Sequence, residues 1–273
     1  MWNILFKSAC TAGLLAICNP LVAQTYDSYT PKKVDKKVKP IRSEFSVGLR
    51  LNTDGWGIFA TKGYVRSKET KLRDQFYNVM LFQLEFSEHK DPKEVKRQLS
   101  EATSGGGVTK TQSFIYGKIN NFYSLKIGFG TQKLLAGKPD PGAVSIHWVA
   151  TGGFALGMEK PYYLDGYVLQ DNATLVHENF KYSDGTKSSF LDERYINGSA
   201  GFSKGLSEIQ FIPGIHANTG VHFDFAANRK TVLAVETGIS AEYYTQAIQI
   251  MANQEAKPYL VNLYASFQFG RRK

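Results

Sequence analysis

The feature that most constrains this chain is a two-residue alternation of apolar and polar side chains over long stretches. It is clearest near the C-terminus, in "YLVNLYASFQFG" (259–270). Successive side chains of a β-strand point to opposite faces, so this pattern predicts strands with one apolar and one polar face. The apolar face of the C-terminal stretch comprises Val261, Leu263, Ala265, Phe267 and Phe269.

The length of these stretches favours a membrane barrel. They run to about 9–16 residues, whereas globular strands are typically about 5–6 residues long and a tilted bilayer-crossing strand needs about 9–11. An apolar face turned to lipid and a polar, glycine-rich face turned to a lumen form the pattern of a transmembrane barrel. A soluble sandwich or a lipocalin-like barrel is the alternative, in which the apolar face forms the core. Nine candidate strands lie at 44–52, 55–66, 75–87, 112–119, 121–131, 143–158, 211–226, 231–246 and 258–270.

The strand count requires one more strand, because bacterial single-chain barrels have an even number. We place it at Tyr162–Gln170, which predicts an all-β fold: a closed antiparallel up-and-down barrel of ten strands. Eight strands, with one hairpin outside the membrane, is the alternative. Side chains fill a barrel of about eight strands, so a general porin is not expected. The predicted outer loops are 88–111, 132–142, 172–210 and 247–257, and the predicted periplasmic turns are Asn120–Asn121 and 226–230.

The N-terminal residues predict export. A charged Lys7, the mostly apolar stretch 8–17 and "LVA" (21–23) have the form of a cleaved signal peptide over residues 1–23. Cleavage would remove both cysteines; lipidation of Cys18 is disfavoured because Ile17 precedes it. Residues 24–43 are lysine-rich and predict a basic periplasmic tether before a barrel domain at 44–273. The expected location is the outer membrane of a Gram-negative cell.

The stretch "GIHANTGVHFDFA" (214–226) places His216, His222 and Asp224 on one strand face. At about 3.3 Å per residue, the two histidines lie about 20 Å apart and cannot share a metal ion, whereas His222 and Asp224 lie about 6–7 Å apart and could pair. Buried charges must be paired, so a structural network is favoured. The predicted lumen network comprises Arg50, Glu85, Lys126, His147, His216, Asn218, His222, Asp224, Glu236, Glu242, Asn262 and Tyr264. The predicted lipid-facing residues are Val221, Phe223, Leu233, Val235, Leu263 and Phe267.

An enzyme that modifies lipid is the less favoured alternative. It would use His147 with Ser145, or His222 with Asp224, while His89 and His177 fall in predicted loops. The sequence contains no HExxH, no phosphate-binding glycine loop and no CxxC, so neither a metal nor a cofactor is expected. The net charge of +9 points to lipopolysaccharide and outer-membrane lipid as anionic partners, rather than to nucleic acid.

Several motifs resemble a family of small outer-membrane β-barrels from Bacteroidota. They are "LNTDGWGIF" (51–59), "YGKINNFYSLKIGFG" (116–130) and "EKPYYLD" (159–165), after a signal peptide ending in "VAQ". The resemblance covers roughly residues 44–273 and carries over no catalytic residue. It implies an accessory subunit of secretion or barrel-assembly machinery.

From the sequence we therefore expect a non-enzymatic outer-membrane barrel that serves as a structural or accessory component of an envelope complex. A narrow solute channel and a lipid-modifying enzyme are the alternatives.

Overall fold

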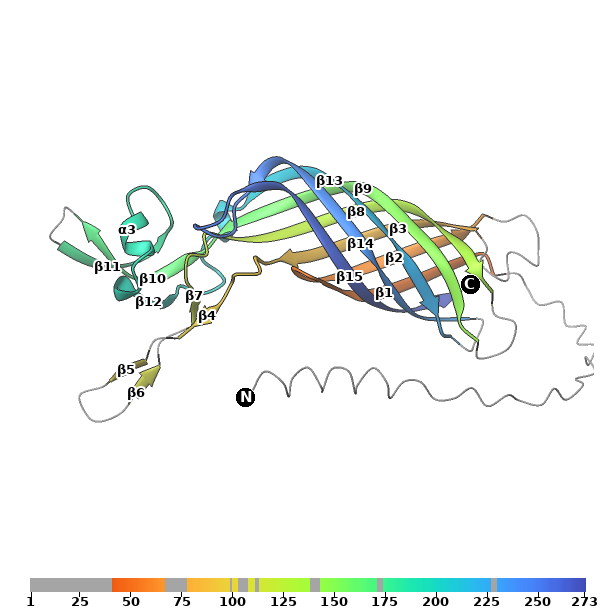
Figure 1. The fold of residues 1–273 in the computed structure, drawn as a ribbon, viewed down its shortest axis with the longest axis horizontal. Coiled ribbons are helices and arrows are strands. Elements are labelled where there is room, and N and C mark those ends of the chain that lie inside the picture. The colour runs from red at the N-terminus through yellow and green to blue at the C-terminus, as the bar shows by residue number, and fades with distance from the viewer. Residues whose placement is uncertain are drawn as a thin grey trace, which may run out of the picture. The chain divides into compact units, whose positions relative to one another are not determined.

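The computed structural model describes residues 41–66, 78–98, 100–102, 108–110, 113–137, 143–170, 174–226 and 230–273. Its largest element is a closed antiparallel barrel of eight strands, in the spatial order β1-β15-β14-β13-β9-β8-β3-β2. The first strand pairs with the last, from Glu44 opposite Arg272 to Asn52 opposite Tyr264, which closes the barrel (Figure 1). The barrel strands are β1 (Ser43–Asn52), β2 (Gly55–Val65), β3 (Asn78–His89), β8 (Asn120–Ala136), β9 (Ser145–Pro161), β13 (Gln210–Asp224), β14 (Thr231–Ile248) and β15 (Lys257–Arg272).

The predicted count of ten strands is wrong, and the eight-stranded alternative is confirmed. The candidate strand 112–119 contains only β7 (Phe114–Ile115), which pairs with β4 (Lys96–Arg97). The added strand at 162–170 forms β10 (Tyr163–Gln170), but in a separate sheet. Both stretches carry apolar residues because they enclose a small core of their own, so their alternation does not mark a membrane crossing.

The direction of each crossing follows from the strand order. Both ends of the barrel chain, at β1 and β15, lie at the same end as the short connection 225–230, whereas the opposite end carries the long connections 90–119 and 162–209. Barrels have short periplasmic turns and longer outer loops, which assigns the two ends. The predicted periplasmic turn at Asn120–Asn121 is therefore wrong, because it begins β8 at the outer end. The predicted outer loop 132–142 is also wrong, since β8 continues to Ala136 at the periplasmic end. Both errors follow from counting 112–119 as a crossing.

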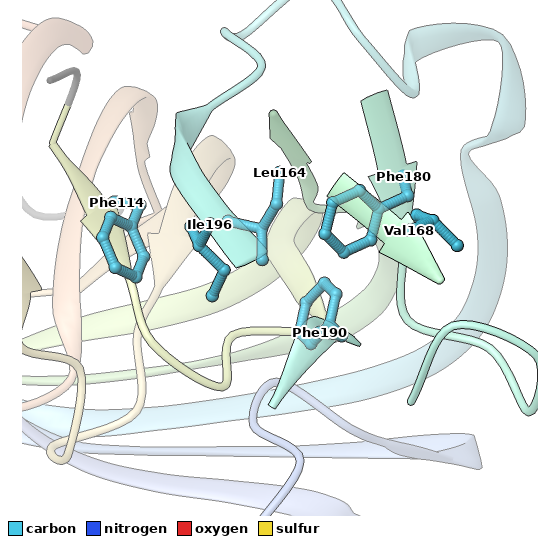
Figure 2. Packing of buried hydrophobic residues seen from close by; sticks show 6 residues of the cluster. All are labelled: Phe114, Leu164, Val168, Phe180, Phe190 and Ile196. Carbon is cyan, nitrogen blue, oxygen red and sulfur yellow. The ribbon is translucent and has the colours of Figure 1, made fainter. Parts of the chain in front are cut away.

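The long outer connections fold into a small domain, here called the outer domain. Its sheet has the order β11-β10-β12, with β11 at Thr174–Lys181 and β12 at Ile196–Ser199, and α3 at Lys187–Phe190 follows β11. Short 3-10 turns lie at Glu193–Tyr195 and Leu206–Glu208, and β5 (Ser100–Ala102) pairs with β6 (Val108–Lys110). The core of the outer domain is apolar (Figure 2); its buried residues are Phe114, Leu164, Val168, Phe180, Phe190 and Ile196.

The outer surface of the barrel carries an apolar belt. Leu263 is 62% exposed and Phe267 53%, and Leu233 and Val235 are also exposed, while Val221 and Phe223 are half-buried. In a soluble barrel these side chains would form the core, so their exposure identifies a face built for hydrocarbon. Exposed aromatic residues edge the belt at both ends, as in membrane barrels: Tyr64 and Trp148 at the periplasmic end, and Trp56, Tyr243 and Tyr259 at the outer end. The chain therefore forms a multi-pass outer-membrane barrel.

Within the described residues, the structure contains no helix that is long and apolar enough to span a membrane. The predicted signal peptide and most of the predicted tether lie outside those residues. The last residues assigned to the tether belong to the barrel end: Ile41 is buried, and the Ser43 amide donates a hydrogen bond to the Lys273 carbonyl at 2.9 Å.

Candidate functional site

The barrel lumen gathers the ionisable residues that the alternation assigned to it. Each strand turns every second side chain inward, so polar groups from all eight walls converge in a space that side chains can fill. All twelve predicted lumen residues are buried: Arg50, Glu85, Lys126, His147, His216, Asn218, His222, Asp224, Glu236, Glu242, Asn262 and Tyr264.

The middle of the lumen holds a chain of ion pairs between Arg50, Glu85, Lys126 and Glu242. The Arg50 Nη1 donates to Glu85 Oε2 at 2.7 Å, and the Lys126 ammonium lies 2.9 Å from Glu85 Oε1. Lys126 also donates to Glu242 Oε1 at 2.7 Å. In the barrel order β8 and β14 are separated by β9 and β13, so the Lys126–Glu242 pair crosses the lumen. Glu85 thus neutralises two cations.

A third carboxylate, Glu236, extends this network. It lies 3.2 Å from His222 Nδ1, accepts a hydrogen bond from the Tyr264 hydroxyl at 2.9 Å and lies 3.8 Å from the Arg50 guanidinium. The Arg50 guanidinium also lies 4.3 Å from the centre of the Tyr264 ring, a cation–π distance. Arg50 is therefore held by two carboxylates and an aromatic face, which compensates its burial.

His89 belongs to the network, and its predicted place in a loop is wrong. It is the last residue of β3 and is buried. Its Nδ1 lies 2.8 Å from Asp54 Oδ2, and its Nε2 lies 3.5 Å from Glu242 Oε1. Since β3 and β14 occupy opposite positions in the barrel order, this contact spans the lumen. Following the alternation of Gln83, Glu85 and Ser87 two residues further would have found His89.

At the periplasmic end, Arg272 joins two acidic residues that the sequence reasoning did not connect. Its Nε donates to Glu44 Oε2 at 3.1 Å, and its Nη2 donates to Asp224 Oδ2 at 2.5 Å. Asp224 therefore pairs with Arg272, and His222 pairs with the Glu236 carboxylate. The sequence could have predicted this role of Arg272, because in the tail "GRRK" it continues the inward-facing alternation of Gln268.

Apolar side chains close both ends of the lumen, so the expected polar lumen describes only its middle. At the periplasmic end Ile41 packs with Val79, Leu81 and Val149. At the outer end a second buried cluster contains Phe122, Ala155, Ile212, Tyr244 and Ile248. The Tyr244 hydroxyl donates to Glu242 Oε2 at 2.6 Å, which joins the outer cluster to the charged layer.

The exposed fraction of the lumen side chains indicates whether the barrel contains a water-filled channel for ions. An aqueous channel would leave its lining side chains accessible to water, but the exposed fraction is 2% for Arg50, 1% for Lys126 and 2% for Glu85. The Lys126–Glu242 pair crosses the lumen from β8 to β14, and apolar clusters lie at both ends of the charged region. In this conformation the lumen is filled, as expected for eight strands.

His216 and the side-chain amides of Asn218 and Asn262 are the remaining predicted lumen residues. His216 Nε2 lies 3.3 Å from the Ile127 carbonyl oxygen, beside Gly128. A Cβ atom at Gly128 would come within 3.0 Å of the imidazole, which explains the glycine there. Asn262 accepts a hydrogen bond from the Thr53 hydroxyl at 2.9 Å, and Asn218 is buried beside Ser240 of the neighbouring strand.

The residues considered for lipid chemistry also face the lumen. His147 stands opposite His222 in the strand register, with the two ring centres 5.9 Å apart, and His147 is 1% exposed. Ser145 is buried on the same inward face, away from the bilayer. Among the residues that the structure describes, no group of three or more His, Cys, Asp or Glu side chains is arranged to hold a metal ion.

Comparisons with known proteins add little. No protein-family model matches the chain, and no curated protein shows significant sequence similarity to it. The solved structures similar to it include three small outer-membrane barrels, all with TM-scores below 0.5. Ail, the attachment invasion locus protein of Yersinia pestis, is 9% identical, with a TM-score of 0.36 over 85% of this chain and 99% of that one. Neisserial surface protein A is 10% identical, with a TM-score of 0.33 over 85% of this chain and 96% of that one. The N-terminal β-barrel domain of Pseudomonas aeruginosa OprF is 10% identical, with a TM-score of 0.32 over 83% and 96%.

Proposed function

We propose that this protein is a closed, non-enzymatic anchor in the outer membrane, which displays its outer domain to a protein partner and so serves as an accessory component of an envelope complex. The observation that carries the proposal is the pairing of a filled lumen with a separately folded outer domain. A barrel that neither conducts nor offers a reachable reaction centre acts through its surfaces.

The filled lumen supports an anchor over a channel or an enzyme. Opening a passage would require breaking the Arg50–Glu85 and Lys126–Glu242 pairs, which leaves charges unpaired in a buried site. A lipid-modifying reaction at His147 would require an acyl chain to enter this same filled interior.

The outer domain supports a binding role. In the described part of the outer domain, β11 pairs with β10 and its other side is an edge, and residues 174–179 are exposed on both faces. Leu175 is 52% exposed, and Val176 and Tyr167 are exposed beside it. An exposed strand edge bearing apolar side chains is a template for the addition of a partner strand.

The resemblance to Bacteroidota barrels that accompany secretion or barrel-assembly machinery indicates the class of partner. We expect a protein of such a complex to bind at the β11 edge. We expect lipopolysaccharide to surround the outer half of the barrel.

Affinity purification from outer membranes tests this function. A tagged full-length chain should retain a specific envelope protein, and Leu175→Lys should lose it by placing a charge on the β11 edge. Leu206→Lys is the matched control, because Leu206 is 46% exposed elsewhere in the outer domain, and it should retain the partner. The accessory role fails if the wild-type chain is recovered alone, or if both variants behave alike.

A further inference from the structure

The lipid-facing wall contains a hollow that the function above does not use. A groove of about 550 Å³ crosses the strands β15, β1, β2, β3 and β8. Its lining is apolar, and large outward-facing side chains such as Val47, Leu49, Leu84, Phe267 and Phe269 surround the small Ala60.

Ala60 produces the hollow. In the strand register Ala60 lies opposite Val47 on one side and Leu84 on the other, and Val47 lies opposite Phe269. A methyl group among these larger side chains leaves a depression in the outward face. Its walls are exposed, including Phe269 at 59% and Leu49 at 59%, so the groove opens towards the hydrocarbon.

Two cations lie in the next lipid-facing row towards the periplasm. Phe45 stands opposite Lys62 on one neighbouring strand and opposite Arg271 on the other. With about 4.8 Å between adjacent strands, the backbones of the two basic residues are about 10 Å apart. Their row is two residues, or about 6.6 Å, from the row that contains Ala60.

Within the described residues, these cations have no acidic partner on the barrel wall. Among the described residues, no ion pair involves Lys62 or Arg271, and their lipid-facing neighbours in the row are Phe45, Phe82 and Thr231. The Lys62 ammonium lies 5.7 Å from the centre of the Tyr64 ring, which belongs to the aromatic residues at the periplasmic edge of the belt. Two unpaired cations at the membrane interface attract anionic headgroups.

We infer that this wall binds an anionic phospholipid of the periplasmic leaflet. One acyl chain lies in the Ala60 groove, and the headgroup phosphate lies between Lys62 and Arg271. The periplasmic leaflet is assigned because the row of cations lies near the ends of β1 and β15, opposite the outer domain. The groove and the two cations lie in adjacent rows of one sheet, so a single lipid molecule can contact both.

Native mass spectrometry of the purified full-length chain tests this site, with three probes: phosphatidylglycerol, zwitterionic phosphatidylethanolamine of identical acyl chains, and lipid A. The wild-type chain should retain one phosphatidylglycerol in preference to phosphatidylethanolamine. Lys62→Gln and Arg271→Gln should each reduce that preference about fivefold. Ala60→Phe fills the groove and should lower the retention of both lipids. Loss of heat-modifiable mobility on gels identifies any variant that fails to fold.

Two matched controls isolate the site. Ala265→Phe introduces the same ring at another small lipid-facing position, outside the groove lining. Lys133→Gln removes an exposed cation near the same end, beside Trp148. Both should bind phosphatidylglycerol as the wild type does. Equal retention of the two lipids by the wild type, unchanged binding by Ala60→Phe, or stronger retention of lipid A than of phosphatidylglycerol would overturn the inference.

Discussion

The barrel and the outer domain enclose two interiors of opposite chemistry within one chain. The lumen is built around Arg50, Glu85 and Lys126, whereas the outer domain is built around apolar residues such as Leu164 and Phe190. The difference follows from what lies outside each interior. The barrel places its apolar side chains against hydrocarbon, while the outer domain, surrounded by water, must place them inside.

The two interiors are also stabilised by different interactions. Apolar burial in the outer domain contributes in proportion to the area removed from water. The lumen depends on the pairing of each charge, because an unpaired buried charge costs more than the pair contributes. Substitutions should therefore act through lost pairing in the barrel and through lost packing in the outer domain.

The largest expected effect is in the lumen. Glu85→Ala leaves Arg50 and Lys126 without their shared carboxylate and should lower the free energy of unfolding by about 3–5 kcal/mol. Urea-induced unfolding in phospholipid vesicles, followed by tryptophan fluorescence, measures the loss. Glu88→Ala on the outward face of the same strand removes a hydrogen bond from Trp56 Nε1 (2.7 Å) and should cost about 1 kcal/mol. Equal losses would contradict the charge-pairing account.

A cavity in the outer domain should act locally. Leu164 is fully buried, so Leu164→Ala should destabilise that domain by about 2–5 kcal/mol through lost packing. Limited proteolysis should show faster cleavage within the outer domain, while the barrel stays folded on gels. Leu175→Ala, at an exposed position of β11, should change cleavage little. Loss of the barrel together with the outer domain would show that the two interiors are not independent.

Backbone strain gives a smaller effect. Gly205 has φ +79°, and a Cβ atom there would lie 2.7 Å from the Pro161 carbonyl oxygen. Gly205→Ala should therefore cost the outer domain about 1–2 kcal/mol for the left-handed conformation, and more for the close contact. Gly201 also has a positive φ (+89°) but has no neighbouring atom within 4 Å of an added Cβ. If Gly201→Ala accelerates proteolysis as much as Gly205→Ala does, the close contact with Pro161 contributes nothing to the destabilisation.

The smallest effect is a pH dependence on the outer surface. Lys181 donates a hydrogen bond to Glu208, as does the Tyr163 hydroxyl at 2.7 Å, and these bonds lower the pKa of the Glu208 carboxyl from its ordinary 4.5. A lowered pKa means that the stabilisation is complete above the unfolded-state pKa and is lost as pH falls through the folded-state pKa. Because the pair is exposed, the loss should stay within about 1 kcal/mol. Protease resistance should weaken at acid pH in the wild type, with less change in Glu208→Gln; an identical pH profile in both would refute the role of Glu208.

Much of the barrel was predictable from the alternation, and the errors share one cause. A period of two reports which face of a strand is buried, but not what covers that face. Phe114 and Leu164 alternate as membrane residues do, yet both belong to the apolar core of the outer domain, so counting their stretches as crossings gave ten strands. The inward placement of Arg50 and Glu236 followed from sequence, whereas the partners did not. Pairing Glu44 with Arg272 depends on the barrel closing between β1 and β15, which no local pattern encodes.

Planar-bilayer conductance of the purified full-length barrel tests the central claim most directly. Because ion pairs cross the lumen and apolar clusters lie at both of its ends, inserted wild-type protein should give no conductance steps. Insertion is verified separately by heat-modifiable mobility of the reconstituted sample. Reproducible, stable single-channel steps from folded wild-type protein would contradict the closed lumen, and with it the proposal that the barrel serves as an anchor.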